Sequence, residues 1–492
     1  MLPPAEHDAY LLEECILRYP TIIQGGMGVG VSSWQLAREV ARAGELGVVS
    51  GTATAVSQAR RLAIGDPGGH VQRALSHFPL PAMARRVYER HFGTAQQADG
   101  VAKFRGVPQP SLEPGTALTE LTVVSNFVEV HLAKAGHDGL VGVNYLEKIQ
   151  LPTLASLYGA MLAGVDYVLM GAGIPARIPA LLDRLAVHEP VTMPVTVADA
   201  DRGDDFEISF DPVAFAAGEP LPPLPRPRFL AIVSSATMAT FLFRNAAGAP
   251  DGFVVETAVA GGHNAPPRGK MRLDDQGQPV YGPRDVIDVA PIAALGLPIW
   301  LAGGYATPES LAEARRLGAQ GIQVGTAFAF CDESGLDPAL KASALQSALA
   351  GDATIRTDAR ASPTGYPFKV LESPGTLSEQ GTYEERPRMC DLGYLRDPYK
   401  RPDGKVGYRC AAEPVDDYVS KGGDAADTEG RRCLCNALVA DIGLGQTRRD
   451  GYIEAALLTA GDDVTGLGRY VPPGATSYSA KHVLDYLLAP PS

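Results

Sequence analysis

The amino-acid sequence predicts an α/β protein, a (β/α)8 TIM barrel with two insertions and a C-terminal cap. Short β-branched runs recur along the 492-residue chain, each followed by a glycine-containing turn and a stretch of helical periodicity. The runs are apolar almost throughout, which indicates strands buried on both faces and therefore a parallel sheet. Eight such units in series are typical of the barrel, and a doubly wound open sheet is the alternative architecture for this pattern.

Eight runs supply the predicted strands of the barrel. They cover residues 21–24, 46–49, 140–144, 167–170, 229–233, 253–256, 299–302 and 321–324. Two of the helices that follow them have clear boundaries. Ser33 is a predicted N-cap for a helix that presents Leu36 and Val40 on one face. Residues 310–317 form a predicted helix that is entered through Pro308.

Three regions do not follow this repeat. Residues 65–120 mix Pro, Gly and His around a predicted helix at 82–92, and they are interpreted as an insertion that a further strand at 121–124 would end. Residues 200–227 combine acidic residues with a proline run and are expected to form a surface excursion or a small hairpin. The third region is the C-terminal part of the chain.

The chain therefore divides into two predicted domains. Residues 15–351 form the barrel with its insertions at about 65–120 and 200–227, and residues 352–492 form the C-terminal cap. The cap contains many Arg-Pro and Asp-Pro breaks and a helical-looking segment at 451–460. We expect it to cover the barrel without making the cofactor site.

Composition excludes several functional classes. The chain is 45% hydrophobic and 20% charged with a formal net charge of -13, so clustered cations for a nucleic-acid partner are lacking. The N-terminal residues have acidic positions where a signal peptide would be basic. No apolar stretch approaches the ~20 residues that cross a bilayer. We expect a cytoplasmic enzyme with a small-molecule substrate and no membrane partner. The sequence leaves its assembly into a homo-oligomer undecided.

Small residues follow nearly every predicted strand, at the barrel end where ligands bind. These exits hold Gly25, Gly26 and Met27, then Asn144, Gly171, Gly261 and Gly262, and finally Gly303, Gly304, Gly325 and Thr326. Glycines allow another molecule to approach the backbone closely, so the mouth suits a large planar ligand. The glycine-rich turns after strands seven and eight offer N–H groups to a phosphate.

The stretch ETAVAGGHN at residues 256–264 supplies the candidate for proton transfer. A histidine held at the end of a buried strand can exchange a proton near neutral pH, and the alternative is that His263 merely caps or packs the strand end. Glu256 is interpreted as a structural partner at the same strand end. Arg268 and Lys270, just beyond the histidine, are either solvated charges or groups that meet an anionic part of a substrate.

These motifs resemble the nitronate monooxygenase family, formerly called 2-nitropropane dioxygenase, which shares its fold with flavin-dependent enoyl-acyl-carrier-protein reductases. The resemblance lies in QGGMG, VGVN, VLMGAGIP, VETAVAGGH and WLAGGYATPESLAEARRLGAQGIQVGT, between about residues 20 and 335. It implies an FMN cofactor without covalent attachment and identifies His263 with the active-site histidine of the family. It also implies that Gly25, Met27 and Asn144 lie along the isoalloxazine and ribityl chain, with Gly303, Gly304, Gln323, Val324, Gly325 and Thr326 at the phosphate.

The resemblance implies an FMN-dependent monooxygenase that oxidises alkyl nitronates with O2 to a carbonyl product and nitrite. In this reaction His263 would remove the α-proton of a nitroalkane or, as imidazolium, hold the anionic nitronate. One alternative is an NAD(P)H-dependent flavin reductase of enoyl groups bound to carrier protein or CoA. Another is a barrel that binds a phosphorylated ligand without catalysis.

Four of the six cysteines lie close together in the last quarter of the sequence. Cys390, Cys410, Cys433 and Cys435 could supply a zinc or iron–sulfur site, but their spacing differs from paired zinc knuckles. The alternative is four buried free thiols, and the sequence leaves both interpretations open. Cys15 and Cys331 stand alone.

Overall fold

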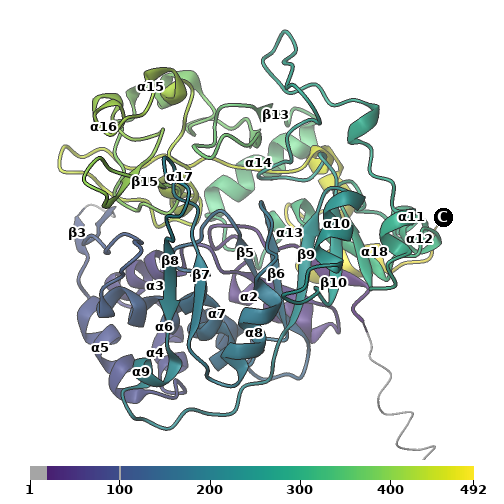
Figure 1. Cartoon of the computed structure of the whole chain (residues 1–492). Coiled ribbons are helices and arrows are strands. Elements are labelled where there is room, and N and C mark those ends of the chain that lie inside the picture. Colours follow the sequence, from purple (N-terminus) through teal and green to yellow (C-terminus); the bar gives the residue numbers. More distant parts are fainter. Residues whose placement is uncertain (1–18, 99–100, 492) are drawn as a thin grey trace, which may run out of the picture.

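Eight parallel strands form a closed barrel at the centre of the computed structural model, which describes residues 19–98 and 101–491. The strand order is β1-β12-β11-β10-β9-β6-β5-β2. Backbone hydrogen bonds from Gln24 N to Leu46 O (3.0 Å) and from Leu46 N to Ile22 O (3.1 Å) join the two ends of this sheet. The predicted TIM barrel is confirmed, and the open-sheet alternative is wrong (Figure 1).

Each predicted strand overlaps one strand of the barrel. The strands are β1 (Ile22–Gln24), β2 (Gly47–Ser50), β5 (Val141–Leu146), β6 (Tyr167–Gly171), β9 (Arg228–Val233), β10 (Gly252–Glu256), β11 (Ile299–Ala302) and β12 (Gly321–Val324). Cys15, near the predicted start of the barrel domain, lies outside the described residues.

Alternate strand positions fill the barrel interior, as the two-residue period of a strand requires. One buried cluster joins Ile23, Val48, Leu169, Leu230, Val254 and Trp300. At the N-terminal end of the barrel, Trp300 donates its indole N–H to the carbonyl oxygen of Pro20 at 2.8 Å. The opposite end of the interior is therefore the one left for a ligand.

Helices surround the strands. They are α2 (Trp34–Arg42), α3 (Thr54–Ala63), α6 (Thr116–Lys134), α7 (Thr153–Leu162), α8 (Ile178–Ala186), α10 (Ala236–Phe243), α11 (Ala290–Ala293), α12 (Pro308–Arg316), α13 (Thr326–Ala329) and α14 (Pro338–Ala350). The Ser33 hydroxyl accepts a hydrogen bond from Leu36 N at 3.2 Å, which confirms the predicted N-cap. Pro308 opens α12 as predicted.

The first insertion contains α4 (His70–Leu75), α5 (Pro81–His91), β3 (Gln96–Ala98) and β4 (Val101–Lys103). The helix at 82–92 is confirmed by α5, but the strand predicted at 121–124 is wrong, because these residues lie within α6. Leu121, Val123 and Val124 are all buried there, since α6 packs against α2, α3, α4, α5 and α7. A helix buried on several sides is apolar at consecutive positions, and that pattern imitates a buried strand.

The second insertion forms an antiparallel hairpin of β7 (Val191–Pro194) and β8 (Glu207–Phe210), followed by α9 (Pro212–Ala216). Residues 200–227 contain only the second strand of this hairpin. The sequence therefore located the hairpin but not its first strand.

Most of the C-terminal elements lie above the barrel in Figure 1, whereas the last helix lies beside it, near α11 and α12. The C-terminal elements are β13 (Ile355–Asp358), β14 (Phe368–Leu371), α15 (Gln380–Glu385), β15 (Asp397–Lys400), β16 (Val406–Arg409), α16 (Val415–Ser420), α17 (Leu434–Ala440) and α18 (Ala480–Leu487), with 3-10 helices η2 (Ala425–Thr428) and η3 (Asp462–Tyr470). A further 3-10 helix, η1 (Pro283–Asp285), precedes β11.

The helix predicted at 451–460 is wrong. This segment is extended, and its backbone is engaged by distant parts of the chain. Leu377 N donates to Ala456 O at 2.8 Å, and Leu371 N donates to Leu458 O at 2.9 Å. These long-range bonds use carbonyl groups that a helix would have paired locally. In the part of the chain that the structure describes, no helix has the length and apolar character needed to span a membrane.

Candidate active site

One cavity of about 230 Å³ opens at the C-terminal ends of the barrel strands, and every predicted site residue contributes to its wall. These residues are Gly25, Gly26, Met27, Asn144, Gly171, Gly261, Gly262, His263, Gly303, Gly304, Gln323, Val324, Gly325 and Thr326. The sequence therefore identified residues from six strand exits that the fold brings together. Their roles toward a cofactor stay predictions.

Three polar side chains face inward at the top of the barrel. Gln323 on β12 pairs in register with Ala302 on β11, which pairs with Glu256 on β10. Ala302 belongs to the cluster inside the barrel, and residues paired across parallel strands point to the same face. Gln323 and Glu256 consequently point into the cavity at one level. Asn144, which pairs with the inward-facing Leu169, does the same from β5.

Two of the glycines are required by the space around them. A Cβ on Gly26 would lie 2.1 Å from the Asn144 Cβ, and one on Gly303 would lie 2.4 Å from the Thr257 hydroxyl oxygen. Gly303 also has φ +81°, a conformation that side chains with a Cβ rarely adopt. The backbone itself thus forms the cavity wall, and a flat ligand can lie directly against it.

The wall leaves hydrogen-bonding groups without partners. The buried Gln323 Oε1 has no hydrogen-bond donor, and among the described residues the N–H groups of Gly303, Gly304 and Gly325 have no acceptor. A buried polar atom is almost always paired, so the buried Gln323 Oε1 indicates a ligand that donates to it. The glycine N–H groups, on half-buried or exposed residues, are free to bind the same ligand. The donors suit phosphate or carbonyl oxygens, and the amide oxygen suits a ring N–H. The residues present therefore fit a flavin nucleotide.

Thr326 departs from the predicted role of a phosphate donor. Its hydroxyl oxygen accepts a hydrogen bond from Gly461 N at 2.9 Å, and it also bonds the Asp463 side chain. Burial raises the pKa of Asp463. In this structure the C-terminal segment therefore engages the hydroxyl that was assigned to a phosphate, and the unpaired glycine N–H groups are the better phosphate donors.

His263 is held at the cavity by residues of the C-terminal part. Its Nε2 lies 2.7 Å from the hydroxyl oxygen of the fully buried Ser362, and Phe368 packs edge-on at 5.0 Å between ring centroids. Burial, together with the positive charge of Lys148, lowers the pKa of His263 to about 4. The imidazole is neutral at pH 7, which favours proton acceptance over holding an anion as imidazolium.

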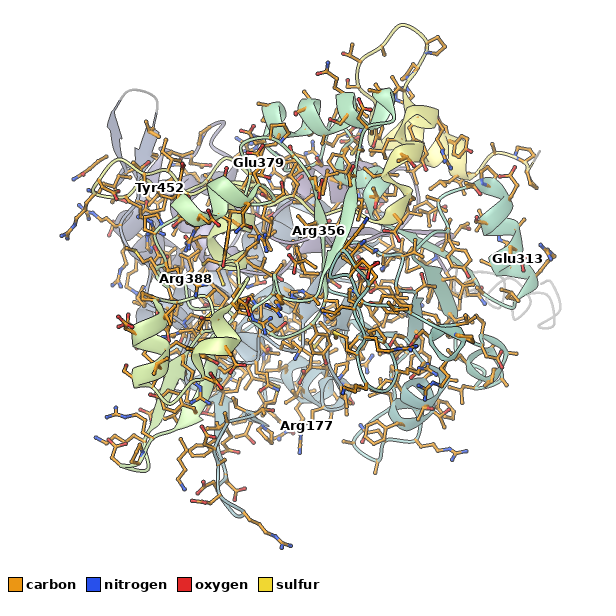
Figure 2. All side chains as sticks on the ribbon, turned by 90° about the horizontal axis from the view of Figure 1, so that it is seen from above. Arg177, Glu313, Arg356, Glu379, Arg388 and Tyr452 are labelled. Atoms are coloured by element: carbon orange, nitrogen blue, oxygen red, sulfur yellow. The ribbon has the colours of Figure 1, made fainter. Side chains whose placement is uncertain are left out.

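The C-terminal part forms a large share of the cavity wall, while the prediction that it does not make the FMN site stays a prediction. Its lining residues are Phe368, Tyr394, Leu395, Leu434, Cys435, Leu438, Asp441, Thr459, Ala460 and Asp463. Most of them are apolar. In Figure 2, seen from above, the labelled residues Arg356, Glu379, Arg388 and Tyr452 of this part spread over the centre and left, whereas Glu313 of α12 lies at the right.

Sequence reasoning missed these residues and Ser362 because they follow no strand and belong to no glycine motif. The two cations that it did consider, Arg268 and Lys270, are exposed and do not line the cavity. Arg268 N donates to Asp285 Oδ1 at 2.7 Å, and its guanidinium donates to Ser234 O at 3.3 Å.

The four C-terminal cysteines do gather in one place. Cys410 and Cys433 form a buried cluster against which Cys390 and Cys435 pack, and all four thiols are free. Within residues 19–98 and 101–491, no group of three or more His, Cys, Asp or Glu side chains has an arrangement that could hold a metal ion. The structure favours free thiols over the predicted alternative of a metal site.

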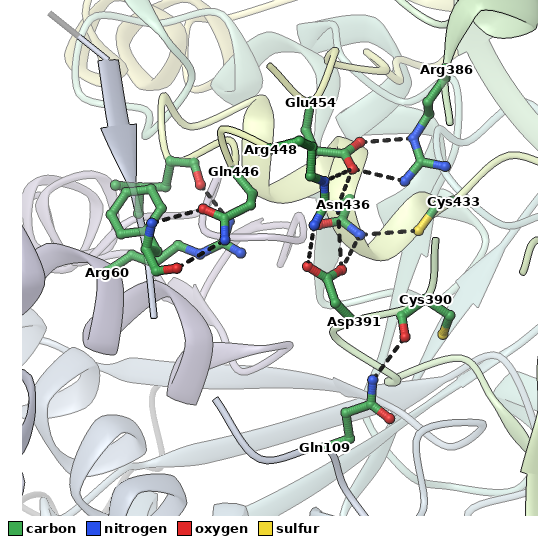
Figure 3. A network of polar contacts seen from close by, with 12 residues as sticks. Arg60, Gln109, Arg386, Cys390, Asp391, Cys433, Asn436, Gln446, Arg448 and Glu454 are labelled. Carbon is green, nitrogen blue, oxygen red and sulfur yellow. Dashed lines mark hydrogen bonds and ion pairs between the residues drawn. The ribbon is translucent and has the colours of Figure 1, made fainter. Parts of the chain in front are cut away.

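A buried polar network lies beside these thiols (Figure 3). The Glu454 carboxylate accepts hydrogen bonds from Arg386 at 2.7 and 3.0 Å and from Arg448. Arg448 also contacts Asp391, which accepts a hydrogen bond from Asn436 at 2.7 Å. Asn436 in turn donates to Cys433 Sγ at 3.4 Å. This network ties together segments of the C-terminal part that contain little regular secondary structure.

The nitronate monooxygenase family model matches residues 219–371. The matched segment runs from before β9 into β14 and contains Glu256, His263 and the glycine-rich exits of β10, β11 and β12. The cavity and this match identify a TIM barrel in which residues 219–371 are similar to an oxidoreductase family. The resemblance to the nitronate monooxygenase family is thereby confirmed.

Three curated proteins are similar to parts of this chain. A probable nitronate monooxygenase of Bacillus subtilis is 37% identical over 93 residues, 19% of this chain and 25% of that protein. One of Staphylococcus haemolyticus is 29% identical over 119 residues, 24% of this chain and 32% of that protein. The "(3aS,4S,5R,7aS)-5-hydroxy-7a-methyl-1-oxo-octahydro-1H-indene-4-carboxyl-CoA dehydrogenase" of Mycobacterium tuberculosis is 27% identical over 233 residues, 44% of this chain and 60% of that protein. The matches span less than two thirds of each relative.

Solved structures also align with this chain over most of its length. FabK from Thermotoga maritima has a TM-score of 0.46 at 17% identity and covers 99% of this chain and 96% of its own. Nitroalkane oxidase from Streptomyces ansochromogenes has a TM-score of 0.43 at 16% identity and covers 95% and 94%.

Proposed function

We propose that this protein is an FMN-dependent oxidoreductase of the nitronate monooxygenase type, which oxidises alkyl nitronates with O2 to a carbonyl product and nitrite. The observation that carries the proposal is the cavity wall itself. Unpaired N–H groups of Gly303, Gly304 and Gly325 and the unpaired Gln323 Oε1 surround one glycine-lined mouth, next to a desolvated histidine.

The residues present would divide the binding of FMN between two sides of the mouth. Gly303, Gly304 and Gly325 would hold the phosphate through their N–H groups, and Gln323 and Asn144 would bond polar atoms of the ring and ribityl chain. Bound FMN supplies an electron acceptor and a centre that reacts with oxygen. Because these glycines have no side chains, the flavin ring would be able to lie directly against the backbone of the cavity wall.

His263 would act on the substrate as a base. Its imidazole is neutral at pH 7 because burial and Lys148 lower its pKa to about 4, so a lone pair is available to accept the α-proton of a nitroalkane. Ser362 and Phe368 fix the plane of the ring. A base held in one orientation reaches the proton in the geometry that transfer needs.

A second candidate is a flavin oxidoreductase that acts on an acyl thioester with NAD(P)H. Two observations favour it. Phe368, Leu434 and Leu438 give the outer cavity an apolar wall that suits an acyl chain or ring, and a curated relative acts on a CoA thioester according to its name. The cofactor site would be the same in both cases, and only the substrate would differ.

Purified protein should be yellow and release FMN on heating. Under anaerobic conditions, propyl-2-nitronate should reduce the bound flavin, whereas NADH and NADPH should not, and oxygen should then yield nitrite. Rapid reduction by a nicotinamide with reoxidation by an enoyl thioester would establish the second candidate. Colourless protein that FMN does not reconstitute would leave only a barrel that binds a phosphorylated ligand.

A further inference from the structure

Glu256 lies in the cavity, and a role as a structural partner at the strand end does not explain this position. It is the last residue of β10, two positions beyond Val254, which is buried inside the barrel. Side chains two positions apart on a strand share a face, so Glu256 points into the mouth at the level of Gln323. It keeps partial accessibility, and this accessible surface lines the cavity.

The carboxyl of Glu256 has no protein partner. Among the described residues no hydrogen bond or ion pair reaches it, and burial raises its pKa to about 7 without a contribution from any charged neighbour. On β11 its partner in register is Ala302, and on β9 Ile232, which pairs with Val254, lies one inward position deeper in the barrel. The other titratable side chains that line the same cavity are His263, Tyr145, Tyr305, Tyr394, Cys435, Asp441 and Asp463.

An unpaired acid at this place opposes folding. A buried polar group without a hydrogen bond destabilises the folded protein, and an apolar side chain would serve the barrel better. Residues that violate such rules are expected at functional sites. The two other carboxyls of the cavity differ, because Asp441 accepts a hydrogen bond from Leu457 N at 2.9 Å and Asp463 bonds Thr326.

We propose that Glu256 is a second proton-transfer residue of this site, which takes up a proton when the bound flavin is reduced and returns it when the flavin is reoxidised. The inference rests on the proposed function. Two-electron reduction to the anionic flavin adds two electrons and one proton at the ring. Glu256 adds one more proton from solvent as its carboxylate becomes a carboxylic acid. Reoxidation by O2 or another acceptor removes the electrons and releases both protons.

The division of labour with His263 follows from the surroundings of each group. His263 faces the part of the cavity formed by Phe368 and the C-terminal segments, where a substrate enters. Glu256 stands on the barrel wall beside Ala302, at the level of the unpaired Gln323 amide. His263 thus serves the substrate carbon, and Glu256 balances the charge that reduction places at the barrel mouth.

The test is a spectroelectrochemical titration of the FMN-loaded protein between pH 6 and pH 8.5. A tenfold change in proton concentration shifts a two-electron potential by about 30 mV for each proton taken up. Wild type should therefore steepen from about 30 mV per pH unit at pH 6 toward about 60 mV above pH 7.5, whereas Glu256→Gln should stay at about 30 mV throughout. Glu256→Asp should retain the steeper slope. Asp463→Asn, which removes a carboxyl elsewhere in the cavity, should also match wild type.

Each result separates the inference from the proposed function. A flavoprotein whose wild-type slope is about 30 mV at every pH, or whose slope is the same in Glu256→Gln, overturns the inference and leaves the proposed function standing. Protein that takes up no FMN overturns both. If the Glu256→Gln variant does not fold, the slope measured on the wild-type protein still tests the inference.

Discussion

Replacement of His263 tests the centre of the proposed chemistry. His263→Asn should lower kcat/KM by about 10²–10⁴-fold, the range for loss of a general acid or base. The affinity for FMN should not change, because His263 is held by Ser362 and Phe368 and not by the glycine turns. Ser362→Ala removes one hydrogen bond of 2.7 Å, worth about 1 kcal/mol, so a loss of about fivefold is expected.

The pH dependence distinguishes a base with a lowered pKa from an ordinary histidine. With the pKa of about 4 that burial produces, His263 is about 97% deprotonated at pH 5.5, whereas an imidazole of pKa ~6.5 would be only about 9% deprotonated. In a Glu256→Gln background, which removes the other group that titrates in this range, kcat/KM should stay nearly constant from pH 7.5 to pH 5.5. Lys148→Met should raise the pKa of His263 and move the acid limb to higher pH.

Steady-state kinetics with a fixed nitronate, together with FMN binding followed by fluorescence quenching, provides both readouts. A tenfold fall of kcat/KM between pH 7.5 and pH 5.5 in that background would show that the histidine is solvated and would refute the reasoning from burial. Unchanged kcat/KM in His263→Asn would make the residue structural.

The remaining predictions concern the cofactor, the C-terminal network and the thiols. Gly304→Val should weaken FMN binding at least tenfold by equilibrium dialysis, because Gly304 has φ +85° and a β-branched residue is strained there; unchanged affinity would remove this turn from the site. Glu454→Gln should lower the urea-unfolding free energy by about 3–5 kcal/mol, and by more than Arg386→Met, because Glu454 is 1% exposed and serves both Arg386 and Arg448; the reverse order would contradict the network. Elemental analysis of anaerobically prepared protein should find less than about a tenth of an equivalent of zinc or iron, and a full equivalent would show that the thiols move together around a metal.

The barrel could be predicted from sequence because its signals are local. A strand buried on both faces is apolar at successive positions, and each exit is marked by glycine. The sequence therefore assigns Gly303, Gly304 and Gly325 to one mouth, and the structure places them in one cavity. The same local signal failed at 121–124, where a helix surrounded by five others is as apolar as a strand.

The C-terminal part could not be predicted because long-range contacts determine its structure. Residues 451–460 have a helical composition, but their carbonyl groups pair with Leu371 and Leu377, about eighty residues away. Glu454 within this segment is held by Arg386 and Arg448. No periodic pattern in the sequence indicates these long-range hydrogen bonds and ion pairs. Lining residues such as Phe368 and Leu434 come from these segments and were missed for the same reason.

The loop that carries His263 is itself built by the C-terminal part. Lys369 N donates to Gly262 O at 2.9 Å, and Asn264 N donates to Pro367 O at 2.9 Å, so β14 fixes the backbone on both sides of the histidine. Gly262 N donates to the Thr459 hydroxyl oxygen at 2.8 Å. The barrel thus provides the groups that would hold the cofactor, and the C-terminal part sets the position of the base and the apolar wall facing the substrate. Changes in that part can alter the substrate while the glycine turns stay the same, which is why motifs that indicate a flavin do not identify what it oxidises.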